Sequence, residues 1–298
     1  VPPTPEQKSF GGSHGGLGRI GSWGGTVPAS YGDIRDPALP GGGGSGTAGG
    51  GVVRIHAGTI VLEGAIRANG VSGWGGISGG AGGSVRVQTD VLSGAGSVSA
   101  DGGAAGMGDY ASTGGSGGGG RVAIYYGSLD GFDVAGHVSA HSAASPAGPG
   151  SVGTVYLQPA GGVSELRIVS HGIATGSWTP LLPGPDGWVR LGSLTIAGAG
   201  VEVAAMDGAP IDCVDIAVLD GANLTHPSPS ATATFALEVH ASGMLHVDAT
   251  SRIDVSGRGS PGGTTLGVRA LGSSKGRAGG SYGGKGYGNA SNSLYGRP

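Results

Sequence analysis

A repeat with a constant spacing is the feature of this sequence that most restricts its fold. Residues 53–55 (Val-Arg-Ile) recur 32 positions later as residues 85–87 (Val-Arg-Val), and residues 66–70 recur at the same offset as residues 98–102. Each segment alternates apolar and polar residues, which is the pattern of a β-strand with one buried face. One such set of strands cannot bury its apolar face alone, but similar sets stacked on one another can.

Further copies extend the repeat along the chain. A third begins at Val122, 37 positions after the second, and reaches residues 138–140, and a fourth opens at Val155. A distant copy covers residues 237–257, in which the sequence aligns residues 237–239 with the strand at residues 53–55. Residues between 194 and 218 hold similar segments with less glycine.

These copies predict an all-β chain folded as a right-handed parallel β-helix. Each backbone strand would pair with the equivalent strand of the next layer, and parallel crossover connections are right-handed. A β-sandwich is the main alternative, because it also uses short alternating strands. It would not require equal offsets between successive sets of strands.

Glycine is the second constraint, because it supplies 71 of the 298 residues. A chain of this composition without a repeat is generally disordered. The glycines gather in tracts whose lengths vary while the strand spacing hardly changes, as expected for loops that leave one corner of a stack. The main tracts are residues 41–51, 73–83, 113–120 and 261–286.

The glycine tracts have two interpretations. They are flexible loops, or they pack side by side as extended, polyglycine-II-like segments, because glycine has no Cβ to keep neighbouring backbones apart. The chain then divides into four parts. These are a glycine-rich segment (1–51), β-helix repeats (52–158), a β-helix continuation with shorter coils (159–259) and a second glycine-rich segment (260–298).

A longer repeat links the two ends of the chain. Residues 11–18 (GGSHGGLG) match residues 279–286 (GGSYGGKG), and both are followed by Tyr-Gly and then by Arg and Pro. Similarity among glycine-rich loops is one explanation. The other is that the chain is one unit of a longer array, or that its ends are equivalent parts of a filament. We therefore expect head-to-tail contact with copies of itself or with adjoining modules, which would order both glycine-rich termini.

Composition excludes several partners and covalent cross-links. The charged fraction is 12% and the net charge is −3, so no broad basic field is available for nucleic acid. No apolar run is long enough to span a bilayer. Cys213 is the single cysteine and has apolar neighbours, which predicts a buried thiol and no internal disulfide. The sequons at Asn223 and Asn289 are glycosylation acceptors if the chain is eukaryotic.

No catalytic motif is present, and we predict no enzyme activity, no cofactor and no metal site. Calcium is the one cation that the loop aspartates could ligate through oxygen, although turn formation explains them better. These residues are Asp33, Asp36, Asp101 and Asp109. A β-helical polysaccharide lyase or hydrolase would need acid and base groups on one face. The best such group is Asp101, Asp109, Tyr110, Tyr125 and Tyr126, for which ordinary surface positions are the simpler interpretation.

Aromatic residues in the glycine-rich loops are the candidate glycan-binding residues. Exposed rings can stack on sugar rings, and they can equally cover packed glycine. The four candidates are Trp23, Tyr31, Trp74 and Tyr110.

A family resemblance is carried by Gly-Gly-x-Val-x-Ile, Ile-x-Ala-x-Gly and Gly-Gly-Ser-His-Gly-Gly-x-Gly with Tyr-Gly-Asp. Together these strings resemble the glycine-rich β-helix modules of very large secreted surface proteins, adhesin-like chains of bacteria and of some protists and algae. The resemblance covers most of residues 10–158 and 235–298. It implies a secreted or cell-surface location and a structural or adhesive role as a repeat unit or filament subunit, and it brings no catalytic residues. A carbohydrate-active β-helix enzyme and a non-catalytic glycan-binding module are the alternatives.

Overall fold

The computed structural model describes residues 9–108, 113–145, 148–173, 175–230 and 233–260. Within these residues the chain is all-β, as predicted, and its helical content is limited to α1 (Val134–His137) and the 3₁₀ turn η2 (Met206–Gly208). No helix in this part of the chain is long and apolar enough to cross a membrane. The strands form four open sheets.

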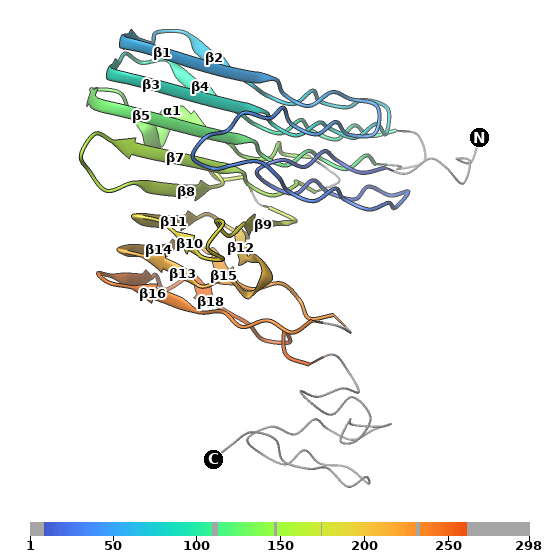
Figure 1. Cartoon of the computed structure of the whole chain (residues 1–298). Coiled ribbons are helices and arrows are strands. Elements are labelled where there is room, and N and C mark those ends of the chain that lie inside the picture. The colour runs from blue at the N-terminus through green and yellow to red at the C-terminus, as the bar shows by residue number, and fades with distance from the viewer. Residues whose placement is uncertain (1–8, 109–112, 146–147, 174, 231–232, 261–298) are drawn as a thin grey trace, which may run out of the picture.

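The largest sheet has eight strands and runs along the whole stack (Figure 1). In spatial order they are β1 (Val52–Val61), β3 (Ser84–Ser93), β5 (Arg121–Asp130), β7 (Thr154–Pro159), β8 (Glu165–Val169), β11 (Ser193–Ala197), β14 (Asp215–Leu219) and β17 (Leu245–Val247).

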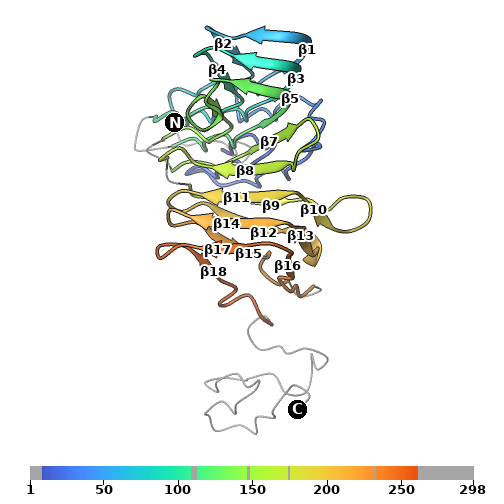
Figure 2. The same cartoon turned by 90° about the vertical axis from the view of Figure 1, so that its left-hand side faces the viewer.

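Three smaller sheets lie beside it (Figure 2). One contains β2 (Ala65–Arg67), β4 (Ser97–Ser99) and β6 (Val138–Ser139). Another contains β10 (Val189–Arg190), β13 (Ile211–Cys213) and β16 (Val239–Ala241). The last contains β18 (Arg252–Ile253), β15 (Asn223–Thr225), β12 (Glu202–Ala205) and β9 (Trp178–Leu181).

The predicted stacking of the first four copies is confirmed in register. Val53 pairs with Val85, Val85 with Val122 and Val122 with Val155, all in parallel. A second row in the same register consists of Ile55, Val87, Ile124 and Leu157. Both rows are buried from β3 onward and half-buried on β1, because β1 is the edge of the sheet.

The direction of the strands reverses between β7 and β8, which the sequence did not predict. These two strands are antiparallel, whereas the strands on either side of them are parallel among themselves. The connection is residues 160–164, where Gly161 has a φ of 68°. So short a connection joins antiparallel neighbours, because a parallel pair needs a crossover of a dozen or more residues.

The apolar interior changes side at this junction. Leu157 of β7 belongs to a first core, which lies between the large sheet and the β2-β4-β6 sheet. Its neighbour Tyr156 points to the opposite face and belongs to a second core. This core lies between β8, β11 and β14 of the large sheet and the two smaller sheets β10-β13-β16 and β18-β15-β12-β9. Tyr156 lies directly opposite Leu166 of β8, which is also in the second core. On the first-core face β8 presents instead the ion pair of Arg167 and Glu165, at 3.2 Å.

The distant sequence copy is in a different register from the one predicted. Residues 245–247, not 237–239, pair with β14 in the large sheet. Val239 pairs with Ile211 in the β10-β13-β16 sheet. The layers that begin with β8, β11 and β14 have three strands each, so a similar spacing between apolar segments does not identify which sheet a strand joins.

The glycine tracts lie side by side and bond to one another at three-residue intervals. Gly79 and Gly82 donate their N–H groups to the carbonyls of Gly115 and Gly118. In a second pair of tracts, Gly114, Gly117 and Gly120 donate to Gly106, Gly103 and Ala100. A Cβ on Gly79 would lie 2.0 Å from the Gly103 carbonyl oxygen, so this approach requires glycine.

The N-terminal glycine motif is buried between these tracts. Gly12 donates to Gly79 and accepts from Gly118, and Gly16 donates to Gly119. Ser13 is fully buried. This contradicts the expectation that a neighbouring unit orders this terminus, because the chain's own tracts supply the hydrogen bonds. The matching C-terminal motif lies outside the described residues.

We expect Val87→Asp to lower the free energy of unfolding by several kcal/mol, because Val87 is buried in the first core and the new carboxylate would have no partner there. Urea denaturation measures the loss. Ser128→Asp, at an exposed position of β5, is the control and should change stability little. An unchanged unfolding midpoint for Val87→Asp would contradict the assigned core.

We expect Gly79→Ala to destabilise the protein by about 1–3 kcal/mol, because the new methyl group forces two packed backbones apart. Gly51→Ala is the matched control, since a Cβ there meets no atom within 4 Å. Equal thermal midpoints for the two variants would show that the tracts are not closely packed in solution.

Candidate functional site

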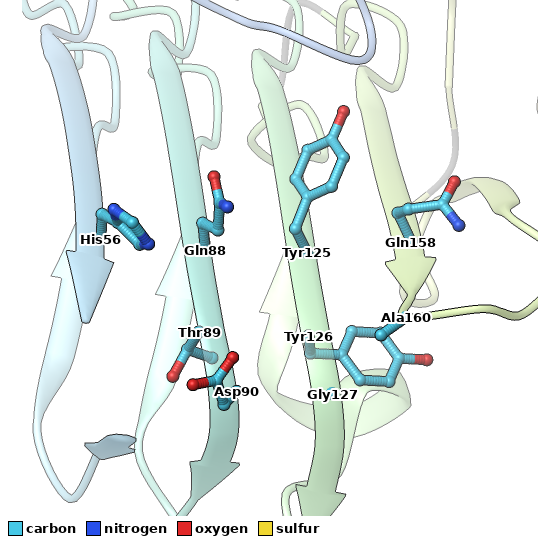
Figure 3. Close-up of a pocket in the computed structure, with 9 residues that line it drawn as sticks. All are labelled: His56, Gln88, Thr89, Asp90, Tyr125, Tyr126, Gly127, Gln158 and Ala160. Atoms are coloured by element: carbon cyan, nitrogen blue, oxygen red, sulfur yellow. The ribbon is translucent and has the colours of Figure 1, made fainter. Parts of the chain in front are cut away.

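A shallow groove lies on the outer face of the large sheet, opposite the first core (Figure 3). One side of it is a row of register partners, in which His56 pairs with Gln88, Gln88 with Tyr125 and Tyr125 with Gln158. Neighbouring strands are about 4.8 Å apart, so the row presents one side chain at each such interval along the stack.

The other side of the groove follows an interruption in the pairing that three strands share. The regular pairing is interrupted at Gly58, Asp90 and Gly127, which occupy equivalent positions on β1, β3 and β5. A Cβ on Gly127 would lie 2.5 Å from the Asp90 carbonyl oxygen. Asp90 and Gly127, together with Thr89, Tyr126 and Ala160, line this side of the groove, which has a volume of about 230 Å³.

Two side chains of the row are held in place. The Tyr125 hydroxyl donates to the Arg35 carbonyl at 2.8 Å. The Gln158 amide nitrogen donates to the carbonyls of Pro159 and Gly162, and its oxygen accepts from the Tyr156 hydroxyl at 3.0 Å. The groove is therefore formed before any ligand arrives.

Residues 30–40 cross the outer face of the sheet beside the groove and are called the strap below. Asp36 of the strap forms ion pairs with Arg54 at 2.8 Å and Arg86 at 2.9 Å. The Arg86 guanidinium also lies 4.8 Å from the centre of the Tyr125 ring. Ile34 of the strap packs against the second core, so the strap connects both halves of the molecule.

The remaining polar groups of the groove are available to a ligand. Among the described residues, the side chains of His56 and Asp90 have no hydrogen-bonding or ionic partner. Burial raises the pKa of both tyrosines, with Tyr156 adding to the effect at Tyr125 and Glu165 at Tyr126. Both phenols are therefore neutral near pH 7, and within the described part of the chain the Tyr126 hydroxyl is a free donor, whereas the Tyr125 hydroxyl already donates to Arg35.

The structure brings together only part of the acid–base group suggested by the sequence. Tyr125 and Tyr126 line the groove, but Asp101 accepts hydrogen bonds elsewhere, from the Ser139 hydroxyl and the His141 backbone. Asp109 and Tyr110 lie outside the described residues. Asp90 is the one carboxylate of the lining, so the groove lacks the pair of carboxylates used by most glycosidases.

The other candidate glycan-binding rings do not gather in one place. Trp23 and Trp74 are exposed on separate loops and neither lines the groove. Tyr31 donates its hydroxyl to Pro40 and packs its ring against His14, at 4.9 Å between centroids.

Sequence reasoning missed Gln88, Asp90 and Gln158 as lining residues. The signal that could have found them is the repeat itself, since His56 and Gln88 are separated by the same 32 positions as Val53 and Val85. His56 is exposed, as expected. The sequence aligned it with His240, which lies in a different sheet.

The loop aspartates form local structure. Asp33 accepts hydrogen bonds from the backbone N–H groups of Arg35 and Asp36, which is a turn-forming role. Among the described residues, no group of three or more His, Cys, Asp or Glu side chains is arranged to hold a metal ion.

Two other predicted positions are buried. Cys213 lies in the second core, and burial raises the pKa of its thiol to about 12, so it is an unreactive packing residue. Asn223 is 6% exposed in β15, so its amide is poorly accessible to glycosylation in the folded chain. Asn289 lies outside the described residues.

A buried cation anchors the start of the strap. Arg121 of β5 is fully buried and donates to the Tyr31 carbonyl at 2.9 Å and to the hydroxyls of Ser30 and Thr154 at 3.2 Å. His14 of the glycine motif lies beside it and contacts the Gly82 carbonyl through Nδ1 at 3.0 Å. The Nε2 of His14 is buried without a partner in the described structure.

Burial and the neighbouring Arg121 lower the pKa of His14 from 6.5 to about 4. The folded chain therefore favours neutral His14, and the unfolded chain binds a proton more readily. We expect this part of the stability to be complete above pH 6.5 and to be lost as the pH falls toward 4, by about 3 kcal/mol.

The measurement is urea denaturation between pH 7 and pH 4. His14→Gln should flatten the stability profile over this interval, whereas His56→Gln, at an exposed position, should retain the wild-type slope. Identical slopes for wild type and His14→Gln would contradict the role assigned to His14.

Comparisons with known proteins identify no relative. No protein family, no curated protein sequence and no solved structure matches this chain.

Proposed function

We propose that the chain is an extracellular structural and adhesive module, built from two parallel β-helical stacks and a polyglycine-II-like bundle. The parallel, in-register rows of β1, β3, β5 and β7 support the first stack, and the layers from β8 to β17 support the second. At the junction both the strand direction and the side of the core change. A rotation of half a turn about the stacking axis produces both changes together. Because a rotation does not change handedness, both stacks have the same hand, which is right-handed by the general rule for parallel crossovers.

The observation that carries this proposal is the hydrogen bonding of the glycine tracts at three-residue intervals. A polyproline-II-type helix has three residues per turn, so bonds that recur every third residue connect one face of each tract to one neighbour. Tracts from successive layers and the N-terminal motif join in the same way. Such a bundle stiffens the stack and leaves few side chains for chemistry, which suits a structural role.

Both ends of the described stack have features that suit contact with a neighbour. The edge strand β1 exposes Val52 and Val61, and the last described layer, β17 and β18, exposes Leu245, Val247 and Ile253. An open strand edge with apolar side chains is a template for pairing with another chain. We infer that copies of the chain, or adjoining modules of a longer secreted or surface protein, stack against these ends.

We expect end-to-end particles whose length increases with protein concentration, as measured by small-angle scattering and electron microscopy. Lysines at Val52 and Val61 should prevent this assembly, because edge lysines oppose strand pairing. Val163→Lys is the control, at a position that is equally exposed but remote from both ends. A strictly monomeric protein, or equal assembly by the edge variant, would contradict the stacking proposal.

The alternative function for a chain with this groove is that of a carbohydrate-active enzyme. We expect no release of reducing or unsaturated sugar ends from neutral or acidic polysaccharides, because the groove holds a single carboxylate. Turnover that is abolished by Asp90→Asn or Tyr126→Phe would overturn this expectation.

A further inference from the structure

We propose that the groove formed by His56, Gln88, Asp90, Tyr125, Tyr126 and Gln158 binds an uncharged polysaccharide, lying along the stack across β1, β3, β5 and β7. This proposal gives the adhesive part of the proposed function a ligand. It does not depend on end-to-end stacking, which uses other residues.

The shape of the groove favours a chain over a single small molecule. Its lining comes from four consecutive strands and is open to solvent, so a ligand can extend past the groove in the stacking direction (Figure 3). The lining residues repeat at the strand spacing of about 4.8 Å, so successive units of a linear polymer meet successive strands.

The aromatic residues supply apolar contact of the right kind. Tyr125 belongs to the outward row and is partly exposed in the groove, whereas Tyr126, the next residue of β5, borders the groove and packs partly against the first core (Figure 3). A tyrosine ring has an apolar face and a polar tip, and a pyranose ring likewise has faces of C–H groups with hydroxyls at its edge. Stacking therefore leaves the sugar hydroxyls free for the polar groups around the rings.

The polar residues match hydroxyl groups, which both donate and accept hydrogen bonds. The Asp90 carboxylate accepts, the Gln88 amide nitrogen and the Tyr126 hydroxyl donate, and the His56 imidazole can do either. None of these four groups has a hydrogen-bond partner within the described structure. The Gln88 oxygen is already occupied, since it accepts from Arg86 at 3.1 Å.

The charges of the groove argue against an acidic ligand. Asp90 is the charged group of the lining and would repel a carboxylate or sulfate. The guanidinium groups of Arg54 and Arg86 lie outside the lining and share the single carboxylate of Asp36. A neutral polysaccharide avoids this repulsion and still uses the carboxylate as an acceptor.

Preorganisation lowers the entropic cost of binding. Tyr125 and Gln158 are fixed by the bonds described above, and Gly127 keeps the floor free of a side chain, since a Cβ there would meet the Asp90 backbone.

The test is a binding measurement with neutral gluco-, manno-, galacto- and xylo-oligosaccharides and with oligomers of uronic acids, by saturation-transfer NMR and calorimetry. We expect at least one neutral series to bind, more tightly for longer oligomers, with an affinity that does not change with salt. Asp90→Ala and Tyr126→Ala should each weaken binding at least about tenfold, which is 1.4 kcal/mol. Trp74→Ala, an exposed aromatic residue outside the groove, should leave it unchanged.

Three results would overturn the proposal. They are the absence of binding by every neutral series at about 10 mM ligand, equal or tighter binding of uronic acid oligomers, and loss of binding in Trp74→Ala but not in Asp90→Ala. Asp90 is exposed, so its variant stays informative if Tyr126→Ala is unstable. End-to-end assembly of the same samples is measured in parallel, which separates failure of this proposal from failure of the stacking proposal.

Discussion

Close approach of glycine backbones is the constraint on which the rest of this structure depends. In the tracts a Cβ would typically lie about 2 Å from a carbonyl oxygen of the neighbouring segment, as at Gly79 and Gly117. Backbone groups that water would otherwise solvate are therefore paired between segments, and the pairing recurs every third residue. Each tract joins a strand of one layer to a strand of the next, so the tracts pack on one another where the strands of successive layers pair.

The N-terminal segment depends on these tracts and in turn connects the two halves of the molecule. Its glycine motif lies between tracts, Arg121 binds the beginning of the strap, and Asp36 pairs with arginines of β1 and β3. Ile34 then reaches the second core on the far side of the β7–β8 junction. One segment thus covers the place where the apolar interior changes side.

The groove is a consequence of the same arrangement. It lies on the outer face of the large sheet, beside the strap, which holds Tyr125 and pairs with two adjacent arginines. The pairing of the strands is interrupted beside it at the equivalent positions Gly58, Asp90 and Gly127. Stacked equivalent positions can therefore form an extended binding surface without any irregular loop.

The sequence by itself determined the strand layers of residues 52–158, because the recurring alternation of apolar and polar residues aligns Val53, Val85, Val122 and Val155, with an offset of 32 between the first two. It also indicated a buried Cys213 and an outward His56. It did not reveal the reversal at β7–β8, since Tyr156 and Leu166 alternate with polar neighbours in the same way whichever face is buried. It placed residues 237–239 in the wrong sheet, because short apolar segments with similar spacing occur in layers of two strands and of three. The groove and the anchoring of His14 and Arg121 were decided only by tertiary structure, since they join residues from separate layers and from the N-terminal segment, and no local pattern encodes which segments meet.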